Sequence, residues 1–289
     1  MRNIEDVFNK DYHYPYIIFS TEELTTEYKE LISSVTHADV SFQVLGKEYY
    51  GYTNTTDQYT AFLTRQKLAY TLYGDSEPFR FKSRLMAGTI YKHASLKGLD
   101  YFWRFEPGSE FICPIQFDPF EYMKQNNKQL SFSLSTHELQ ENVPSLYSTA
   151  MKFKAEHPQW KPPTDKPENS LLSGMVDKQG RYNRCYFWNN FQIGKLDFFR
   201  DEKFTTFFDY LDRKNGIFYE RWADPVIHSL AAALFLDKSQ VHKWEDIGYR
   251  YHHYYTHCPS KRELWEKCTC RPEQNFDFDG QSCLSGFDL

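Results

Sequence analysis

The sequence predicts an α/β layered fold, and three observations support this expectation. Short apolar stretches typical of buried strands alternate with segments in which apolar residues recur at helical spacing. The chain of 289 residues is long enough to bury a substantial core. Neither an internal repeat nor a low-complexity tract breaks the pattern. We therefore expect one domain over residues 1–289, with the chemistry on loops at the carboxyl ends of strands.

The first half of the chain begins with a strand that leads into a helix. Residues 16–19 are typical of a buried strand, and Ser20 with Glu23 forms a capping box for a helix that runs through Val35. The expected elements that follow are, in order, a strand over 40–45, a helix from an Asp57 cap through Leu72, a strand over 99–105, a short helix opened by Asp118-Pro119 and a strand over 130–134.

The second half contains a long polar segment before apolar material resumes. Residues 161–181 carry three prolines and two glycines among polar residues, which predicts a surface loop and not a domain boundary. Asp224-Pro225 then supplies a cap and a first-turn proline for a largely apolar helix through Phe235.

The composition excludes some classes of partner. The net charge is -5 and no basic cluster is present, so we expect no nucleic-acid partner. Aromatic residues make up 18% of the chain, and although flat rings suit sugar faces, most are expected to be ordinary core. The longest apolar run, residues 230–236, is far shorter than the roughly 20 residues of a membrane span. Any membrane attachment is therefore expected to need an anchor upstream of Met1.

The six cysteines point to disulfide bonds. Cys268, Cys270 and Cys283 crowd a polar carboxyl-terminal tail that has little apolar material to hold it down. Their spacing does not supply the two cysteine pairs of a zinc site. We expect an oxidising compartment, with which the sequon Asn54-Thr55-Thr56 is compatible.

Three places in the sequence offer groups for metal chemistry. Glu106 begins the turn Glu106-Pro107-Gly108 after an expected strand, where a carboxylate can hold a divalent cation against a diphosphate; the alternative is a solvated turn residue. Residues 251–257 contain three histidines, which are either imidazole ligands or partners in local hydrogen bonds. Asp277-Phe278-Asp279 has an acid-x-acid pattern, but its place in the tail favours a turn.

Six longer segments form a specific pattern. They are Tyr101-Phe-Trp-Arg-Phe-Glu-Pro-Gly108, Tyr186-Phe-Trp-Asn-Asn-Phe191, Leu196-Asp-Phe-Phe-Arg200, Phe218-Tyr-Glu-Arg-Trp222, His228-Ser-Leu-Ala-Ala-Ala-Leu-Phe235 and Asp246-Ile-Gly-Tyr249. In their residues, their order and the positions of all six cysteines, they resemble the fungal α-1,2-mannosyltransferases of glycosyltransferase family 15.

The resemblance implies a GT-A-like α/β/α layered domain with a mixed sheet. It also implies GDP-mannose as donor, Mn²⁺ as cofactor, retention of anomeric configuration, and a type II anchor in the Golgi membrane with the domain in the lumen. The implied acceptor is a mannose hydroxyl of a glycoprotein N- or O-glycan, joined in α-1,2 linkage.

The resemblance also implies roles for particular residues. Glu106 and His252 correspond to the metal ligands, with His253 as a fallback because this chain has one extra residue between Gly248 and Cys258.

The resemblance implies a catalytic role for two further acids, and each also has a purely structural interpretation. Glu138 lines the donor site or is an exposed charge after a strand, and Asp224 belongs to the acceptor region or is purely a helix cap. The expected substrate-binding residues are Phe79, Arg104, Trp188, Asn190 and Glu220.

Several positions depart from the family pattern. Gln192 stands where the family has a glutamate that is proposed as the nucleophile or ion-pair partner at the anomeric carbon, and an amide cannot form a stable glycosyl ester. Near the donor, Phe79 replaces a tyrosine, Ser83 a cysteine and Ala87 a glutamate. Family members have an opening strand and helix before the helix in which Met1 falls, so the resemblance implies an amino-terminally truncated domain whose first strand is missing and whose sheet edge is exposed.

Three hypotheses follow from these matches and departures. The first is mannosyl transfer from GDP-mannose. The second is mannosylphosphate transfer, which needs no nucleophile at the sugar carbon and fits Gln192 better. The third is a non-catalytic glycan-binding partner of active transferases.

Overall fold

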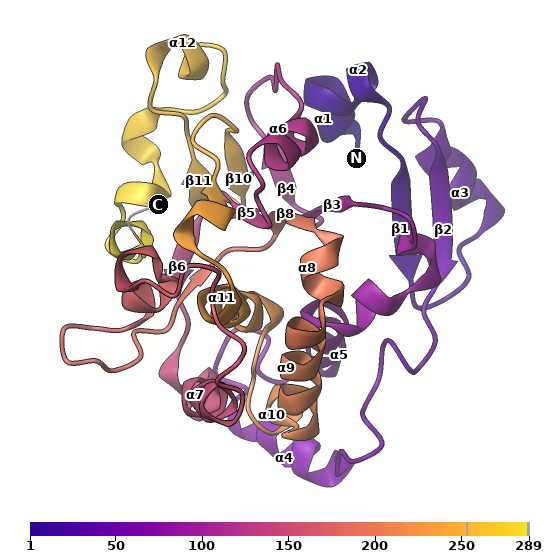
Figure 1. The fold of residues 1–289 in the computed structure, drawn as a ribbon. Coiled ribbons are helices and arrows are strands. Elements are labelled where there is room, and N and C mark those ends of the chain that lie inside the picture. Colours follow the sequence, from indigo (N-terminus) through magenta and orange to yellow (C-terminus); the bar gives the residue numbers. More distant parts are fainter. Residues whose placement is uncertain (253, 288–289) are drawn as a thin grey trace.

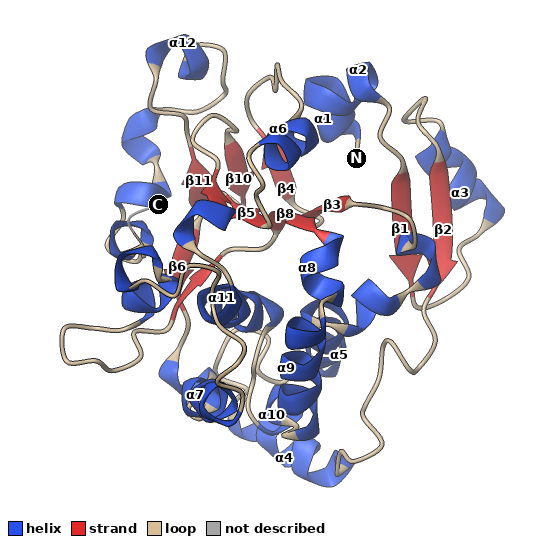
Figure 2. Cartoon of the chain, viewed as in Figure 1, coloured by secondary structure: helices blue, strands red, loops and turns tan. Residues whose placement is uncertain are grey.

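The computed structural model describes residues 1–252 and 254–287 and confirms the predicted α/β architecture. Most strands lie in the upper half of the view in Figure 2, with helices above and below them, and two strands stand apart at the right. The strands are β1 Tyr16–Ser20, β2 Val40–Val44, β3 Tyr101–Phe105, β4 Ser109–Phe111, β5 Leu130–Phe132, β6 Ser135–His137, β7 Cys185–Phe187, β8 Phe191–Lys195, β9 Val241–Lys243, β10 Tyr249–Tyr251 and β11 Tyr255–His257. The main helices are α3 Thr26–Ser33, α4 Gln58–Lys67, α5 Glu77–Ala87, α6 Pro119–Gln125, α7 Leu146–Glu156, α8 Leu196–Arg200, α9 Glu202–Arg213, α10 Gly216–Tyr219, α11 Asp224–Phe235 and α12 Arg262–Trp265.

The strands form four hydrogen-bonded groups. The largest has the order β3-β8-β5-β9, in which β5 and β9 are parallel and the other neighbours antiparallel. A second group, β11-β10-β4, is antiparallel throughout. β1 and β2 form a parallel pair, and β6 and β7 form an antiparallel one. This combination agrees with the expected mixed sheet.

The core is centred on α11, which is buried along almost its whole length. It is apolar on every side, as expected for a helix that other elements enclose. It packs against β7, α5 and α9 (Figure 1). Its first residue, Asp224, is buried and contacts Arg104, which lies on β3 just before the Glu106 turn.

Local signals gave most elements correctly, and the structure corrects three of them. The capping box at Ser20 and Glu23 was wrong, because α3 begins later and Thr25 accepts the capping hydrogen bond from the Tyr28 amide. α4 has the predicted Asp57 cap but ends at Lys67 and not at Leu72. Residues 161–181 are not only a surface loop, since two 3₁₀ turns form there and Leu171 and Met175 are buried.

The amino-terminal segment is helical from Arg2 to Tyr12, with short α-helical turns on either side of a π-helical one, as expected for a chain that starts in a helix. Within the described residues, β1 pairs with β2 alone and β3 with β8 alone. The expectation of a missing first strand concerns sequence before Met1 and stays a prediction.

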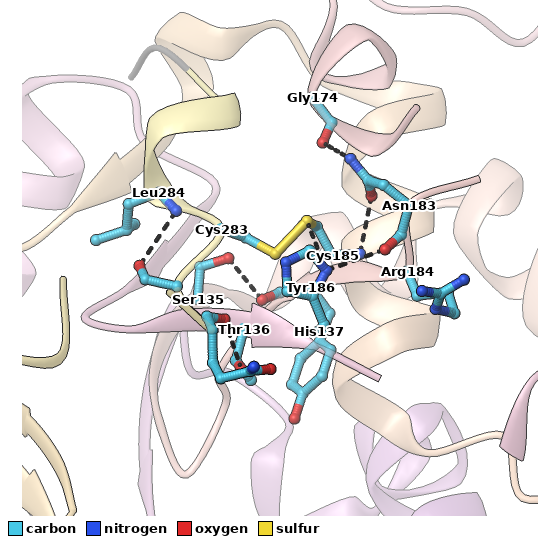
Figure 3. Close-up of a disulfide and its surroundings, with 12 residues drawn as sticks. Ser135, Thr136, His137, Gly174, Asn183, Arg184, Cys185, Tyr186, Cys283 and Leu284 are labelled. Carbon is cyan, nitrogen blue, oxygen red and sulfur yellow. Dashed lines mark hydrogen bonds between the residues drawn. A yellow bond between two sulfur atoms is a disulfide. The ribbon is translucent and has the colours of Figure 1, made fainter. Parts of the chain in front are cut away.

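The cysteines form three disulfides, which confirms the expectation of cross-links in the tail. The pairs are Cys113–Cys268, Cys185–Cys283 and Cys258–Cys270. In Figure 3 the second pair joins β7 to the tail, beside the imidazole of His137, whose Nδ1 lies 3.0 Å from the Asn183 carbonyl oxygen. Each bond ties tail residues to the sheets or to one another.

The structure contains no candidate for a bilayer-crossing helix within the residues it describes.

Candidate active site

The Glu106 turn is fixed by backbone hydrogen bonds. The Glu106 amide donates to the Asn190 carbonyl oxygen at 3.1 Å, and the Ser109 amide donates to the Glu106 carbonyl oxygen at 3.0 Å. Gly108 has a φ of +90°, which a residue with a side chain rarely adopts. The carboxylate of Glu106 therefore projects from a defined bend between β3 and β4.

His252 lies beside this bend although it is remote in sequence. β10 pairs with β4 so that Tyr251 lies opposite Ser109, and His252 follows directly. A Cβ built on Gly108 would lie 3.7 Å from His252 Cε1. His252 is thus brought to the turn that contains Glu106 by the pairing of two three-residue strands. The fallback ligand, His253, lies outside the described residues.

Two basic side chains neutralise Glu106. Lys82 Nζ lies 2.6 Å from one carboxylate oxygen, and Arg104 Nη2 lies 2.5 Å from the other. Burial alone would raise the pKa of Glu106, but the charges of Arg104 and Lys82 outweigh it and lower the pKa to about 2. Glu106 is consequently an anion at any physiological pH.

Asp224 is part of the same network. Its Oδ2 accepts from Arg104 Nη1 at 2.5 Å and from Asn189 Nδ2 at 2.6 Å. The suggestion that Asp224 is a helix cap was wrong, because Ala223 occupies the cap position and no side chain caps the helix. A guanidinium with a full positive charge forms a stronger hydrogen bond to a carboxylate than a neutral backbone amide does. Arg104 therefore joins two carboxylates, Glu106 and Asp224.

Gln192 lies on the same face of the sheet as Arg104, since the two residues are directly opposed in the β3–β8 pair. Its side chain is fully buried, and neither amide atom has a hydrogen-bond partner in the part of the chain that the structure describes. An unpartnered buried amide costs about 1–3 kcal/mol. The residue opposite Arg104 is thus uncharged in this chain, and the polar atoms of the Gln192 amide are available to a water or a ligand.

A second cluster contains Glu138. Its Oε2 accepts from Arg221 Nη1 at 3.0 Å, and its Oε1 accepts from Asn142 Nδ2 at 2.8 Å. The Arg221 guanidinium in turn lies over the Phe79 ring, 4.6 Å from its centroid. The local alternative of an exposed charge is wrong, because the Glu138 side chain is only 10% exposed.

Glu220, expected to bind substrate, has hydrogen-bond partners within the chain. Its carboxylate accepts from the Ser145 hydroxyl at 2.6 Å and from Trp222 Nε1 at 2.5 Å. These bonds join α10 to the start of α7. The neighbouring Arg221 is the residue that reaches Glu138.

Aromatic rings gather at β10 and β11, the strands on either side of His252. Trp188 packs on Tyr255 with ring centroids 4.5 Å apart and on Tyr251 at 5.8 Å. Asn190, expected to bind substrate, contributes its carbonyl to the Glu106 turn. These contacts place three aromatic rings together beside the segment that carries His252.

Sequence reasoning missed three participants: Lys82, Asn189 and Arg221. Asn189 and Arg221 lie inside segments that had been singled out, each next to a residue that was chosen, so the segments were informative while the exact side chain was not. Lys82 carried no local signal, since a lysine in an amphipathic helix is usually an exposed charge.

Glu106 and His252 have the chemistry of a divalent-cation site. A carboxylate oxygen and an imidazole nitrogen both suit Mn²⁺. Glu106 stays ionised, the His252 imidazole has no hydrogen-bond partner among the described residues, and Lys82 is 43% exposed, so it can move into solvent. Two other groups of potential ligands in the described part of the chain consist of disulfide-bonded cysteines, with His137 in one of them, and are closed to a metal while oxidised.

The chain is similar to solved mannosyltransferases over almost its entire length. Core-mannan synthase A from Aspergillus fumigatus, in a Mn/GDP form, superposes with a TM-score of 0.90 at 30% identity, covering 99% of this chain and 78% of that one. The mannosyltransferase Ktr4p from S. cerevisiae, in complex with GDP, gives a TM-score of 0.91 at 32% identity, covering 99% and 75%. These likenesses confirm the expected GT-A-like fold.

Sequence comparison agrees. A glycolipid 2-alpha-mannosyltransferase 2 from Candida albicans is 38% identical over 288 residues, which are 98% of this chain and 61% of that relative. The chain thus spans about three fifths of the length of this curated relative. The sequence profile described as glycolipid 2-alpha-mannosyltransferase matches residues 1–288. The chain therefore belongs to the glycolipid 2-alpha-mannosyltransferase family, glycosyltransferase family 15.

Proposed function

We propose that residues 1–289 are a catalytic domain that transfers mannose from GDP-mannose to a mannose hydroxyl of a glycoprotein N- or O-glycan, forming an α-1,2 linkage with retention. One observation carries the proposal: β4 and β10 pair so that an ionised glutamate and an imidazole lie at the same bend. The family and the GDP-bound solved relatives support the donor.

Glu106 and His252 would hold the metal, and Mn²⁺ fits this donor set. The ion would supply positive charge to the diphosphate that leaves with GDP. Lys82 lies at the same carboxylate and would move to solvent or to a phosphate oxygen. Arg104 would orient Glu106 and Asp224, because it is bonded to both.

Gln192 sets the limits of the chemistry. It cannot form a glycosyl ester, so the acceptor oxygen would attack the anomeric carbon from the side that the diphosphate leaves. The bond between that carbon and the diphosphate oxygen breaks, the new glycosidic bond forms, and the hydroxyl proton passes to the departing phosphate. The remaining proposed catalytic and binding residues are Glu138, Asp224, Phe79, Trp188, Asn190 and Glu220. The Glu220 carboxylate also accepts hydrogen bonds from Ser145 and Trp222.

The same observation on Gln192 favours a second candidate, mannosylphosphate transfer. There the acceptor attacks phosphorus and GMP leaves, so the sugar carbon needs no partner. A third candidate, a glycan-binding protein that does not turn over, also agrees with a neutral residue at this position.

Incubation with GDP-mannose, Mn²⁺ and an α-mannoside acceptor separates the three candidates. Release of GDP with a mannosylated product supports our proposal. Release of GMP supports the second candidate, and release of neither supports the third. The Gln192→Glu variant is expected to raise the rate of GDP release, since the carboxylate adds negative charge beside an oxocarbenium-like transition state.

We also propose a lumenal location in the Golgi, with attachment through an anchor outside these residues. Three disulfides support an oxidising compartment. Asn54 is exposed, as a glycosylation acceptor must be.

A further inference from the structure

The carboxyl-terminal tail encloses a hollow that the catalytic proposal does not use. Its volume is about 510 Å³, within the range of small-molecule sites. It lies between the β10–β11 hairpin and the tail, which run side by side in Figure 1. The lining residues share a polar or aromatic character and include Arg250, Tyr254, Thr256, Glu273, Gln274 and Phe278.

The walls of this hollow are held in place. The Cys258–Cys270 disulfide closes one side, and Asn275 Nδ2 donates to the Cys258 carbonyl oxygen at 2.9 Å. Phe276 is buried and packs on Tyr255 with ring centroids 5.1 Å apart. A hollow with a cross-linked frame binds without the cost of ordering its own loops.

Two large aromatic rings at the hollow are exposed. Phe278 is 76% exposed and Tyr254 is 55% exposed. The Tyr254 hydroxyl donates to the Asp279 carboxylate at 2.9 Å, which fixes the ring. An exposed ring on a fixed backbone contributes little to folding, but it presents a flat apolar face to a ligand.

Polar groups without protein partners surround these rings. Neither the Glu273 carboxylate nor the Gln274 amide is hydrogen-bonded to another side chain within residues 1–252 and 254–287, and both are exposed. Together they offer acceptors and two donors. The side chains at the hollow include two carboxylates, Glu273 and Asp279, against one guanidinium, which disfavours an anionic ligand such as a phosphate.

These properties match a neutral carbohydrate. A pyranose has an apolar C–H face that packs on an aromatic ring and hydroxyls at its edge that pair with carboxylates and amides. Tyr254, which lines the hollow, follows the proposed metal ligand His252 by two residues in the chain.

We propose that this hollow binds mannose units of the acceptor glycan beyond the unit that receives the new sugar. The proposal rests on the proposed function for the identity of the sugar. It assigns Phe278 and Tyr254 as binding residues that select longer acceptors, and it gives them no part in bond formation.

Direct binding tests the hollow without turnover. We would titrate the 289-residue chain with α-1,2-linked mannotriose in the absence of GDP-mannose and follow binding by calorimetry. Phe278→Ala is expected to weaken binding about tenfold, as expected from loss of one stacked ring. Tyr59→Ala is the matched control, because this 69% exposed ring lies on α4, at the opposite end of the molecule from α12 in Figure 1. Equal affinity of the Phe278→Ala variant and the native chain would overturn the proposal.

Kinetics give the second readout. For Phe278→Ala we expect KM for mannotriose to rise about tenfold, with kcat and the KM for methyl α-mannoside unchanged. Gln274→Ala should act in the same direction by a smaller factor. A loss of kcat with both acceptors would contradict a role limited to the hollow. If no transfer occurs yet Phe278→Ala still weakens mannotriose binding, the proposed function fails and the glycan site stands; if transfer occurs and acceptor length has no effect, the reverse holds.

Discussion

Glu106 and Asp277 are each paired with two basic groups, and we propose only Glu106 as a metal ligand. Glu106 pairs with Lys82 and Arg104, while Asp277 pairs with Lys243 Nζ and His257 Nδ1, both at 2.8 Å. Both acids have a lowered pKa. The acid-x-acid pattern belongs to Asp277; the segment forms the predicted turn, a 3₁₀ turn over Phe276–Phe278, and Asp277 fixes the tail through its two basic partners.

The difference lies in whether a partner can leave. His257 is fully buried and the Lys243 side chain is 13% exposed, so the partners of Asp277 cannot turn to solvent. The Lys82 side chain is 43% exposed, and His252, the other proposed metal ligand, lies beside the turn. We therefore choose Glu106 as the proposed metal ligand for the mobility of its partner Lys82 and for its neighbour His252, and not for a short acidic motif.

The largest effect should come from Glu106→Gln. The variant keeps the shape but removes the charge, so we expect kcat/KM for GDP-mannose to fall about 10³-fold, with weaker Mn²⁺ binding. GDP release and Mn²⁺ titration measure the two effects. Glu110→Gln is the control on β4, since its carboxylate pairs with Arg250 and is 50% exposed; it should change either value less than about twofold. Unchanged Mn²⁺ affinity in Glu106→Gln would remove Glu106 from the metal site.

Asp277→Asn should lower the stability of the fold and leave Mn²⁺ binding intact. It leaves the buried His257 without its anion, while Lys243 keeps its pair with Glu245, and breaking a buried pair in this way costs about 3–5 kcal/mol. We expect a lower midpoint of denaturant unfolding with Mn²⁺ affinity retained. Asp279→Asn, which affects an exposed bond to Tyr254, should cost less than about 1 kcal/mol. Equal stability of the two variants would mean that Asp277 does not fix the tail.

Lowering the pH should reduce the stability of the region around Asp224 and of the region around Asp277 over different pH ranges. Burial lowers the pKa of His228, on the helix behind Asp224, to about 4 from 6.5, although the Asp224 carboxylate opposes the shift. The unfolded chain therefore binds a proton that the native chain excludes, so this stability is complete above pH 6.5 and is lost as the pH falls towards 4, by about 3 kcal/mol in total.

The contribution of Asp277 has the opposite origin and a lower pH window. Burial would raise its pKa, but the His257 hydrogen bond, together with the charges of His257 and Lys243, lowers it, so its stability is present above the ordinary value of 3.8 and is lost only below it. Unfolding measured from pH 7 to 3 should show the His228 loss first. In His228→Leu the slope between pH 6.5 and 4 should flatten, and an unchanged slope would assign it to another group.

Sequence patterns predicted the parts of this comparison that depend on neighbours along the chain. The strand before Glu106 and its Pro-Gly turn were readable, because apolar runs and turn residues act locally. The pairing of β4 with β10 was not readable from pattern, since three-residue strands have no usable periodicity and the partners Glu110 and Arg250 are 140 residues apart. Family resemblance supplied that link.

Side-chain partners were predicted least well. Asp224 obeys the local rule for a helix cap, but Arg104 and Asn189 compete for its carboxylate from other strands and loops. Glu220 was selected from the sequence, but the adjacent Arg221 contacts Glu138. Only the fold decides which of two adjacent side chains points to Glu138. Six cysteines allow 15 pairings, and only the folded chain selects one.

The smallest predicted effect is the most direct test of the idea that a partner must leave. Lys82→Met removes the cation that competes for Glu106 Oε2 and leaves Arg104 in place, so Mn²⁺ binding without nucleotide should become tighter by roughly fivefold, about 1 kcal/mol, the size of a half-exposed ion pair. Lys92→Met is the control, because Lys92 forms an exposed pair with Asp209. Weaker binding in Lys82→Met would mean that Lys82 assists the site, and the contrast with Lys243 would then rest on His252 alone.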